Sequence, residues 1–345
     1  MGSGNAYASP MIHGTLGGSP AIVGFLRGRT LEELQEYHEQ QIGRSPGQVF
    51  DLYRWAIGET PGYAITVAEG RFFVLAVAGQ IYEYDRERFE ALVGETPHED
   101  DTALIVPVSV EVEERLAEVP TMLAQINANR RLSSSTFKEI ALGEYGTLAA
   151  IDHVMFRAGI LSGYPHIADE DKDLDHLMTC LSHSEQIELV SRILESLGLH
   201  VSAPTGGFVK NIDLFVRNDR IHPVDFGAFS VPGRRAFRPG TVGVQVRAPS
   251  SRVDTTIPEG VDFVVVSTML PNDPDNDRDP RMLDLSWIQS GLAIAPRAGE
   301  WLERVVRWVP YAGRVIRRLA DAADPGDSGR SVAPGSEQMP SRSVV

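Results

Sequence analysis

Three residues in two strand-like segments have side chains suited to phosphate chemistry. Asp213 lies in the run 211–217, and Gln245 and Arg247 lie in the run 241–248. Carboxylate and amide oxygens can hold Mg²⁺, which positions water and neutralises charge on a phosphate. Side chains alternate along a strand, so Gln245 and Arg247 share one face. Such chemistry needs a fold that brings the two strands together.

The sequence around these residues is locally basic. Residues 210–252 include eight basic and three acidic residues, whereas residues 30–118 include six basic and 19 acidic residues, and the whole chain has a net charge of −15. The overall charge argues against indiscriminate binding of polyanions. The basic stretch predicts a phosphate footprint, with solvated arginines as the alternative. The residues expected to contact nucleic acid are Lys210, Arg234, Arg235, Arg238 and Arg252.

Four segments in this part of the chain together resemble a known enzyme family. They are SEQIELVSRILESLGLHV, KNIDLFVRN, VGVQVRAP and VDFVVVST. In this order they resemble the Mrr-type restriction endonucleases of the PD-(D/E)XK nuclease superfamily. The pattern of that family is a helix, a strand ending in Asp and a strand carrying Gln-x-Lys. The resemblance covers about 110 residues, from Ser182 to Leu292.

The resemblance implies a role for each candidate residue. Asp213 and Gln245 would hold Mg²⁺, with Asp225 as an alternative ligand and Glu188 as a further acidic candidate. Arg247 would stand where the family has lysine. The implied function is metal-dependent DNA endonuclease activity of restriction or repair type. Arginine is too basic to shuttle a proton but can hold a phosphate, so the alternative is a catalytically inactive nucleic-acid-binding or scaffold protein with a nuclease-like fold.

The expected fold class is α/β, with an α+β N-terminal domain and a restriction-endonuclease-like C-terminal domain around a central mixed sheet. Composition and periodicity divide the chain into a flexible leader (1–20), an acidic α+β domain with a meander-like antiparallel sheet (21–130), a helical connector (131–181), the nuclease-like domain (182–295), basic amphipathic helices (296–320) and a disordered tail (321–345).

Local signals predict the individual elements. Thr30 and Glu33 have the spacing of a capping box, which predicts a helix from Leu31 to about Ile42. A strand over 103–112 is expected to lead into a helix over 113–129. Further strands are expected over 63–68, 71–77, 199–203, 211–217, 241–248 and 261–268.

Cys180 is the only cysteine, which excludes an internal disulfide and fits a reducing cytoplasm. No apolar run reaches the length of a membrane span, and residues 1–20 lack the features of a secretory signal. His176, Cys180 and His183 have a helical spacing that could hold zinc, but no fourth ligand is evident. Besides DNA, a protein partner is a candidate, bound through the acidic N-terminal domain or the helices at 300–319. A homodimer is a further candidate. For the helices at 300–319, a membrane-surface role is the alternative.

Overall fold

The computed structural model describes residues 20–27, 30–40, 48–60, 62–83, 87, 101–124, 145–166, 173–202, 212–219, 240–247, 262–268 and 282–323. The chain forms two compact units. Unit 1 comprises residues 1–188 and 304–312, and unit 2 comprises residues 189–303 and 313–345. Both units combine helices with a sheet, so the chain has the mixed α/β composition expected from the sequence.

Unit 1 contains a four-stranded antiparallel sheet in the order β1-β4-β3-β2. Glu69 and Gly70 form the β2–β3 turn with φ values of 47° and 73°, the left-handed conformation that a tight hairpin favours. The predicted strands on either side of this turn are confirmed, whereas β1 was not predicted. The strands are β1 (Ala21–Arg27), β2 (Ala64–Ala68), β3 (Arg71–Val77) and β4 (Asp101–Arg115).

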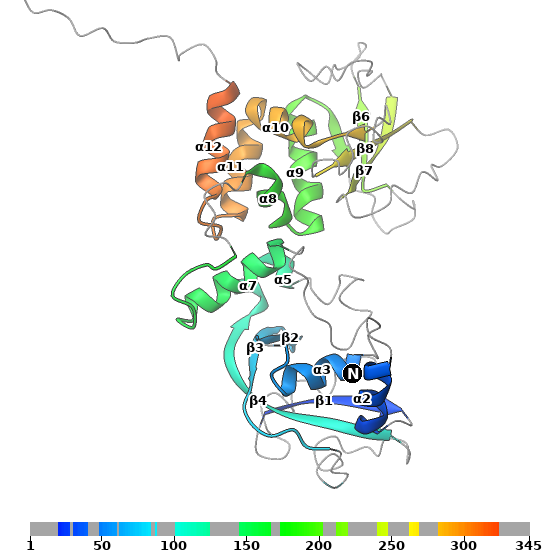
Figure 1. Ribbon diagram of the computed structural model, residues 1–345. Helices are drawn as coiled ribbons and strands as arrows, with labels where there is room; N and C mark the ends of the chain where they lie inside the picture. The colour runs from blue at the N-terminus through cyan, green and yellow to red at the C-terminus, as the bar shows by residue number, and fades with distance from the viewer. Residues whose placement is uncertain are drawn as a thin grey trace, which may run out of the picture. The chain divides into compact units, whose positions relative to one another are not determined.

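Helices pack against both faces of this sheet (Figure 1). The Thr30 capping box is confirmed, because the Glu33 amide donates to Thr30 Oγ1 at 3.2 Å and the Thr30 amide donates to Glu33 Oε2 at 3.3 Å. The helix after it packs on the next helix through Leu34 and Phe50. The helices are α2 (Leu31–Gln40), α3 (Gln48–Ala56), α5 (Thr121–Ala124) and α7 (Tyr145–Arg157).

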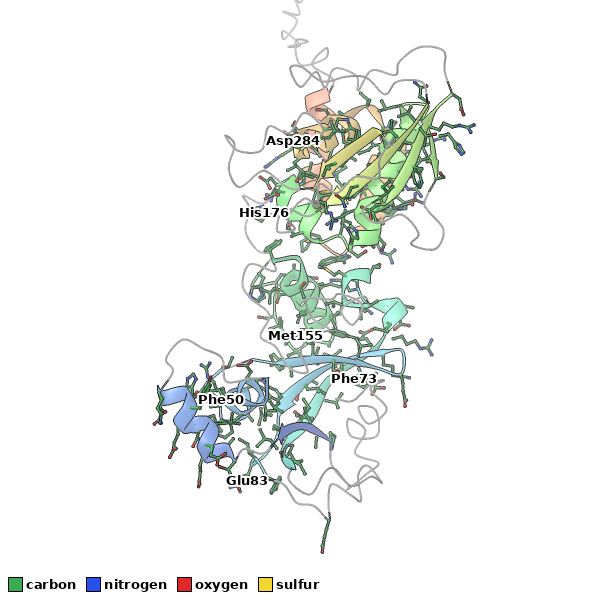
Figure 2. The ribbon with its side chains drawn as sticks, turned by 90° about the vertical axis from the view of Figure 1, so that its right-hand side faces the viewer. Phe50, Phe73, Glu83, Met155, His176 and Asp284 are labelled. Atoms are coloured by element: carbon green, nitrogen blue, oxygen red, sulfur yellow. The ribbon has the colours of Figure 1, made fainter. Side chains whose placement is uncertain are left out.

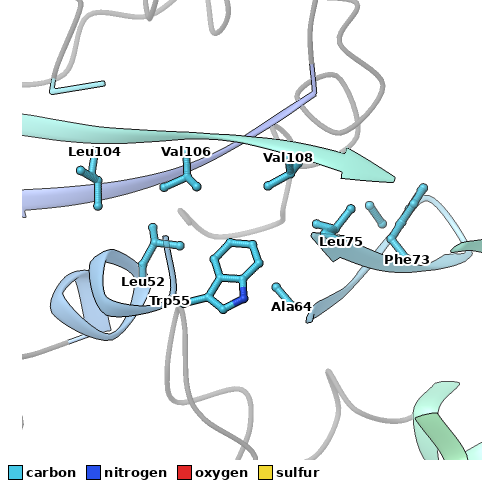
Figure 3. Packing of buried hydrophobic residues seen from close by; sticks show 9 residues of the cluster. Leu52, Trp55, Ala64, Phe73, Leu75, Leu104, Val106 and Val108 are labelled. Carbon is cyan, nitrogen blue, oxygen red and sulfur yellow. The ribbon is translucent and has the colours of Figure 1, made fainter. Parts of the chain in front are cut away.

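Alternation along β3 creates two cores, one on each face of the sheet. Phe73 and Leu75 pack with Trp55 of α3 in one cluster (Figure 3). Phe72 and Val74 pack in the other cluster, with residues of α5 and α7. Because all four β3 residues are fully buried, β3 is the central strand that joins the two layers of helices.

The predicted helix over 113–129 is wrong over 113–118, is confirmed over 121–124, and lies outside the described residues over 125–129. β4 continues to Arg115, a short 3₁₀ helix, η1 (Leu116–Glu118), follows, and α5 begins only at Thr121. Val112 is buried and Glu113 is exposed, so the period-two pattern of the strand extends beyond the predicted end. An ion pair between Arg71 and Glu113 at 2.7 Å joins β3 to this part of β4.

The described parts of the segment 131–181 belong to unit 1 and contribute to its core. Val154 and Met155 of α7 lie in the second cluster of buried residues; Met155 is labelled in Figure 2. α8 (Leu174–Thr179) begins at Asp173, whose carboxylate accepts from the amides of Asp175 and His176. The first turns of α9 (His183–Ser196) complete this part of unit 1.

Unit 2 contains a mixed five-stranded sheet in the order β5-β6-β7-β8-β9. β5 and β6 are antiparallel, as are β6 and β7, whereas β8 runs parallel to both β7 and β9. The strands are β5 (His200–Ser202), β6 (Leu214–Asn218), β7 (Gly240–Arg247), β8 (Asp262–Ser267) and β9 (Met282–Leu283). The first four fall within the segments predicted as strands to within one residue.

Helices lie on one side of this sheet (Figure 1). They are the later part of α9, then α10 (Leu285–Ile294), α11 (Pro296–Val305) and α12 (Ala312–Ala323). Asp284, labelled in Figure 2, caps α10 by accepting from the Ser286 amide at 3.0 Å. Within the part of the chain that the structure describes, no helix has the length and apolar character needed to cross a membrane.

Candidate functional site

The pairing of β6 with β7 brings Asp213 and Gln245 to neighbouring positions. Leu214 pairs with Val244, so the residue before β6 lies beside the residue after Val244. The Asp213 amide donates to the Val244 carbonyl at 2.9 Å, which extends this contact to the edge of the strand. Asp213 comes immediately before β6 rather than at the end of a strand, and the antiparallel pairing brings the start of β6 beside the end of β7.

A backbone hydrogen bond fixes the Asp213 carboxylate. Oδ2 accepts from the Val246 amide of β7 at 2.7 Å. The residue is half-buried, and this contact holds one carboxylate oxygen against the backbone of β7. Asp213 is therefore a positioned anion at the edge of the β6–β7 pair.

Gln245 presents a buried oxygen that has no hydrogen-bond partner. The residue is 1% exposed, and its Oε1 makes no hydrogen bond with the residues that the structure describes. Leaving a buried polar atom unsatisfied costs about 1–3 kcal/mol, so native proteins rarely keep one without a reason. A cation placed beside Asp213 would supply the missing partner.

Arg247 follows two residues after Gln245 on the same face of β7. It is half-buried, and its Nε makes no hydrogen bond with any residue in the described ranges. The parallel pairing places Ser267 of β8 opposite Arg247, and the Thr268 amide donates to the Arg247 carbonyl at 3.1 Å. The end of β7 is thus fixed from both sides, by β6 and by β8.

Ser267 is a site neighbour that the sequence analysis missed. It is buried and occupies the β8 position paired with Arg247. Ser267 and Thr268 follow the apolar run of β8, and this pair of residues could have identified the neighbour. Hydroxyl groups at the end of a buried strand need hydrogen-bond partners.

The remaining predicted residues are not part of this described cluster. Glu188 is exposed on α9 and belongs to unit 1, not to the unit that contains Asp213. The described part of the chain holds no group of three or more His, Cys, Asp or Glu side chains arranged for a metal. The residues that lie outside the described part are Lys210, Asp225, Arg234, Arg235, Arg238 and Arg252.

The zinc-like spacing in the sequence does not correspond to one continuous helix. α8 ends at Thr179 and α9 begins at His183, with Cys180 as the C-cap between them. His176, labelled in Figure 2, pairs its Nδ1 with Asp173 Oδ1 at 3.0 Å. Burial raises the pKa of the Cys180 thiol to about 12, and among the described residues no three His, Cys, Asp or Glu side chains come together as a metal site.

Asp213 and Gln245 do fit a hard divalent cation. They offer oxygen donors, one of them charged and one buried without a partner, which is the donor chemistry that Mg²⁺ and Mn²⁺ prefer. Comparison with known proteins found no match to a family model, to a curated protein or to a solved structure. The geometry of β6 and β7 therefore carries the functional argument.

Proposed function

We propose that unit 2 is a nuclease-like core that binds a divalent metal through Asp213 and Gln245 and cleaves DNA. The observation that carries this proposal is the buried Gln245 Oε1, which lacks a partner beside an anchored carboxylate. A metal held there satisfies the amide oxygen and offsets the charge of Asp213.

The order of elements supports the same proposal. α9 precedes β5, β6 and β7, with Asp213 at β6 and the Gln-x-Arg sequence in β7. The order of helix and strands agrees with the one that the resemblance to Mrr-type endonucleases implies, although Asp213 comes just before β6 rather than at the end of a strand. Antiparallel pairing of β6 with β7 accounts for the approach of residues separated by a long stretch of sequence.

Asp213, Gln245 and Arg247 have distinct roles in this proposal. Asp213 and Gln245 hold the metal, which supplies Lewis-acid polarisation of the phosphate and lowers the pKa of water. Arg247 holds a phosphate oxygen through its guanidinium and does not act as a general base, because arginine stays protonated. The half-buried position of Arg247 strengthens this electrostatic contact.

Arg247 also favours a second candidate function, a catalytically inactive protein with the same fold that grips nucleic acid without cutting it. An inactive core retains the phosphate contact and needs no metal. In that case the basic residues between 210 and 252 provide most of the affinity, and binding falls steeply with salt.

An Arg247→Lys variant separates the two candidates. We expect the wild-type protein to nick duplex or branched DNA in Mg²⁺ or Mn²⁺ but not in EDTA, and we expect Arg247→Lys to keep or increase the rate, since lysine can hold the phosphate and also exchange a proton. The measurement is cleavage of labelled duplex and branched DNA, with binding followed in parallel by fluorescence anisotropy.

The inactive protein gives the opposite pattern. Binding is then equal in Mg²⁺ and EDTA, no cleavage occurs, and Arg247→Lys weakens binding because the bidentate contact with phosphate is lost. That combination of results would replace the nuclease proposal with the second candidate.

A further inference from the structure

Unit 1 contains a cleft that shares no residue with the site at Asp213. Its volume is about 600 Å³, within the usual range of small-molecule sites. Three separate parts of unit 1 contribute to it: the 3₁₀ helix after β4, helix α7, and the turn at residues 306–309. The residues that line it are Ala117, Glu118, His153, Arg157, Arg307 and Trp308.

A row of aromatic rings leads to this cleft. Phe156 lies 4.5 Å from Tyr164, Tyr164 lies 6.2 Å from His153, and His153 lies 5.7 Å from Trp308, measured between ring centroids. Trp308 is half-buried and packs against the core that includes α7. Among the described residues, the ring contact of Trp308 is with His153. A flat ring bound in the cleft would extend this row by stacking.

Two guanidinium groups line the same cleft. Arg157 is held in place, because its Nη1 donates to the Glu118 carbonyl at 3.0 Å and its Nη2 lies 3.6 Å from Glu114 Oε1. Arg307 is exposed and makes no ion pair within the described part of the chain. Planar guanidinium groups match the oxygens of a phosphate, so this pair is suited to an anionic ligand.

The charge of the cleft favours an anionic ligand that also carries hydroxyl or N–H groups. Glu118 is the one carboxylate in the lining, against two guanidinium groups. Burial, and then the nearby charge of Arg157, lower the pKa of His153 below its ordinary value of 6.5, so the ring is neutral at pH 7. The lining thus offers neutral aromatic faces, two cations and one acceptor for hydroxyl or N–H donors.

We propose that this cleft binds a nucleoside 5′-phosphate, with the base stacked on the Trp308–His153 rings and the phosphate held by Arg157 and Arg307. Glu118 accepts a hydrogen bond from the ribose hydroxyls. A free nucleotide and the 5′-terminal nucleotide of a strand present the same chemistry. The proposal stands independently of the nuclease proposal, which concerns unit 2.

Calorimetric titration of the full-length protein with adenosine 5′-monophosphate tests this site, with EDTA present so that no metal site contributes. We expect submillimolar binding, and we expect adenosine alone and inorganic phosphate alone to bind at least about tenfold more weakly. Arg307→Glu should weaken binding by about tenfold or more. Both Arg307 and the control residue Arg318 are exposed, so neither variant threatens the fold, and Arg318→Glu should bind as the wild type does.

Competition then distinguishes the two sources of the ligand. Displacement by a 5′-phosphorylated oligonucleotide, but not by its 5′-hydroxyl counterpart, identifies a strand end, and failure of both to compete identifies a free nucleotide. The proposal is overturned if adenosine 5′-monophosphate shows no binding up to about 10 mM, or if Arg307→Glu binds it as tightly as Arg318→Glu does.

Discussion

Gln245 and Gln186 are both buried amides, but their surroundings differ. Gln186 Nε2 donates to the Met178 carbonyl at 3.1 Å and to the Leu181 carbonyl at 3.3 Å. Gln245 Oε1 has no hydrogen-bond partner within the described part of the chain. Gln186 therefore stabilises the junction of α8 and α9, whereas the Gln245 oxygen lacks the partner that, in our proposal, a bound metal would supply.

Substitution by leucine should have opposite effects at these two positions. We expect Gln245→Leu to raise the free energy of unfolding by about 1 kcal/mol, because the unsatisfied oxygen is removed, while binding of Mn²⁺ is lost. Gln186→Leu should lower the free energy of unfolding by about 1–3 kcal/mol, because it removes two hydrogen bonds from a buried amide to the Met178 and Leu181 carbonyls. Chemical denaturation in EDTA measures both free energies of unfolding, and calorimetric titration with Mn²⁺ measures the affinity for the metal.

The stability change of Gln186→Leu is the reference against which the stability change of Gln245→Leu is judged. If Gln245→Leu destabilises unit 2 as strongly as Gln186→Leu destabilises unit 1, then Gln245 is a structural residue and its oxygen is satisfied in solution. Unchanged affinity for Mn²⁺ in Gln245→Leu would remove this residue from the metal site.

At the level of elements, close approach of α7 to the end of α8 depends on a glycine. A Cβ atom added at Gly146 would lie 1.8 Å from the Thr179 carbonyl oxygen, which belongs to the backbone and cannot move aside cheaply. Gly299 in α11 has the opposite environment, because an added Cβ would meet nothing within 4 Å.

The same substitution should therefore change stability in opposite directions at the two helices. We expect Gly146→Ala to lower the free energy of unfolding by about 3 kcal/mol, the upper end for overpacking in a core. Gly299→Ala should raise it by about 0.5–1 kcal/mol, since alanine is the better helix former. Thermal unfolding of the two variants beside the wild type provides the comparison, and equal effects would show that α7 and α8 do not pack as described.

Elements with a local cause were predictable from the sequence. The Thr30 capping box and the Glu69-Gly70 turn depend on residues a few positions apart, and both lie where the pattern placed them. The error at 113–129 arose because helical spacing was preferred over an alternation that continued through Val112 and Glu113. Local pattern could not show that β4 pairs with both β1 and β3, which is what extends it.

The candidate site was predictable in its residue types but not in its geometry. Asp213 and Gln245 lie on strands joined by a long segment, and a connection of that length does not fix the register. The parallel pairing that sets Ser267 opposite Arg247 depends on long-range contacts that no local signal encodes. The hydrogen bond from the Val246 amide to Asp213 follows from the same register.

At the scale of the whole molecule, the acidic and basic stretches lie in different units, and each unit holds one of the two proposed sites. The acidic stretch at 30–118 lies in unit 1, and the basic stretch at 210–252 lies in unit 2 with Asp213 and Gln245. The proposed nuclease site and the proposed nucleotide cleft thus belong to separate compact units. Each can be disabled by a substitution that leaves the other intact.

Metal-dependent cleavage by an Asp213→Asn variant tests the central claim most directly. Asparagine keeps an oxygen to accept from the Val246 amide but removes the charge that holds the metal, so loss of activity is not confused with loss of the fold. The matched control is Asp219→Asn, which changes an exposed carboxylate paired with Arg217 after the other end of β6. We expect the wild type and Asp219→Asn to cut DNA at similar rates in Mn²⁺ and Asp213→Asn to lose at least about a hundredfold. Cleavage that survives in Asp213→Asn, or an equal loss in Asp219→Asn, would contradict the assignment of the metal site to the β6–β7 pair.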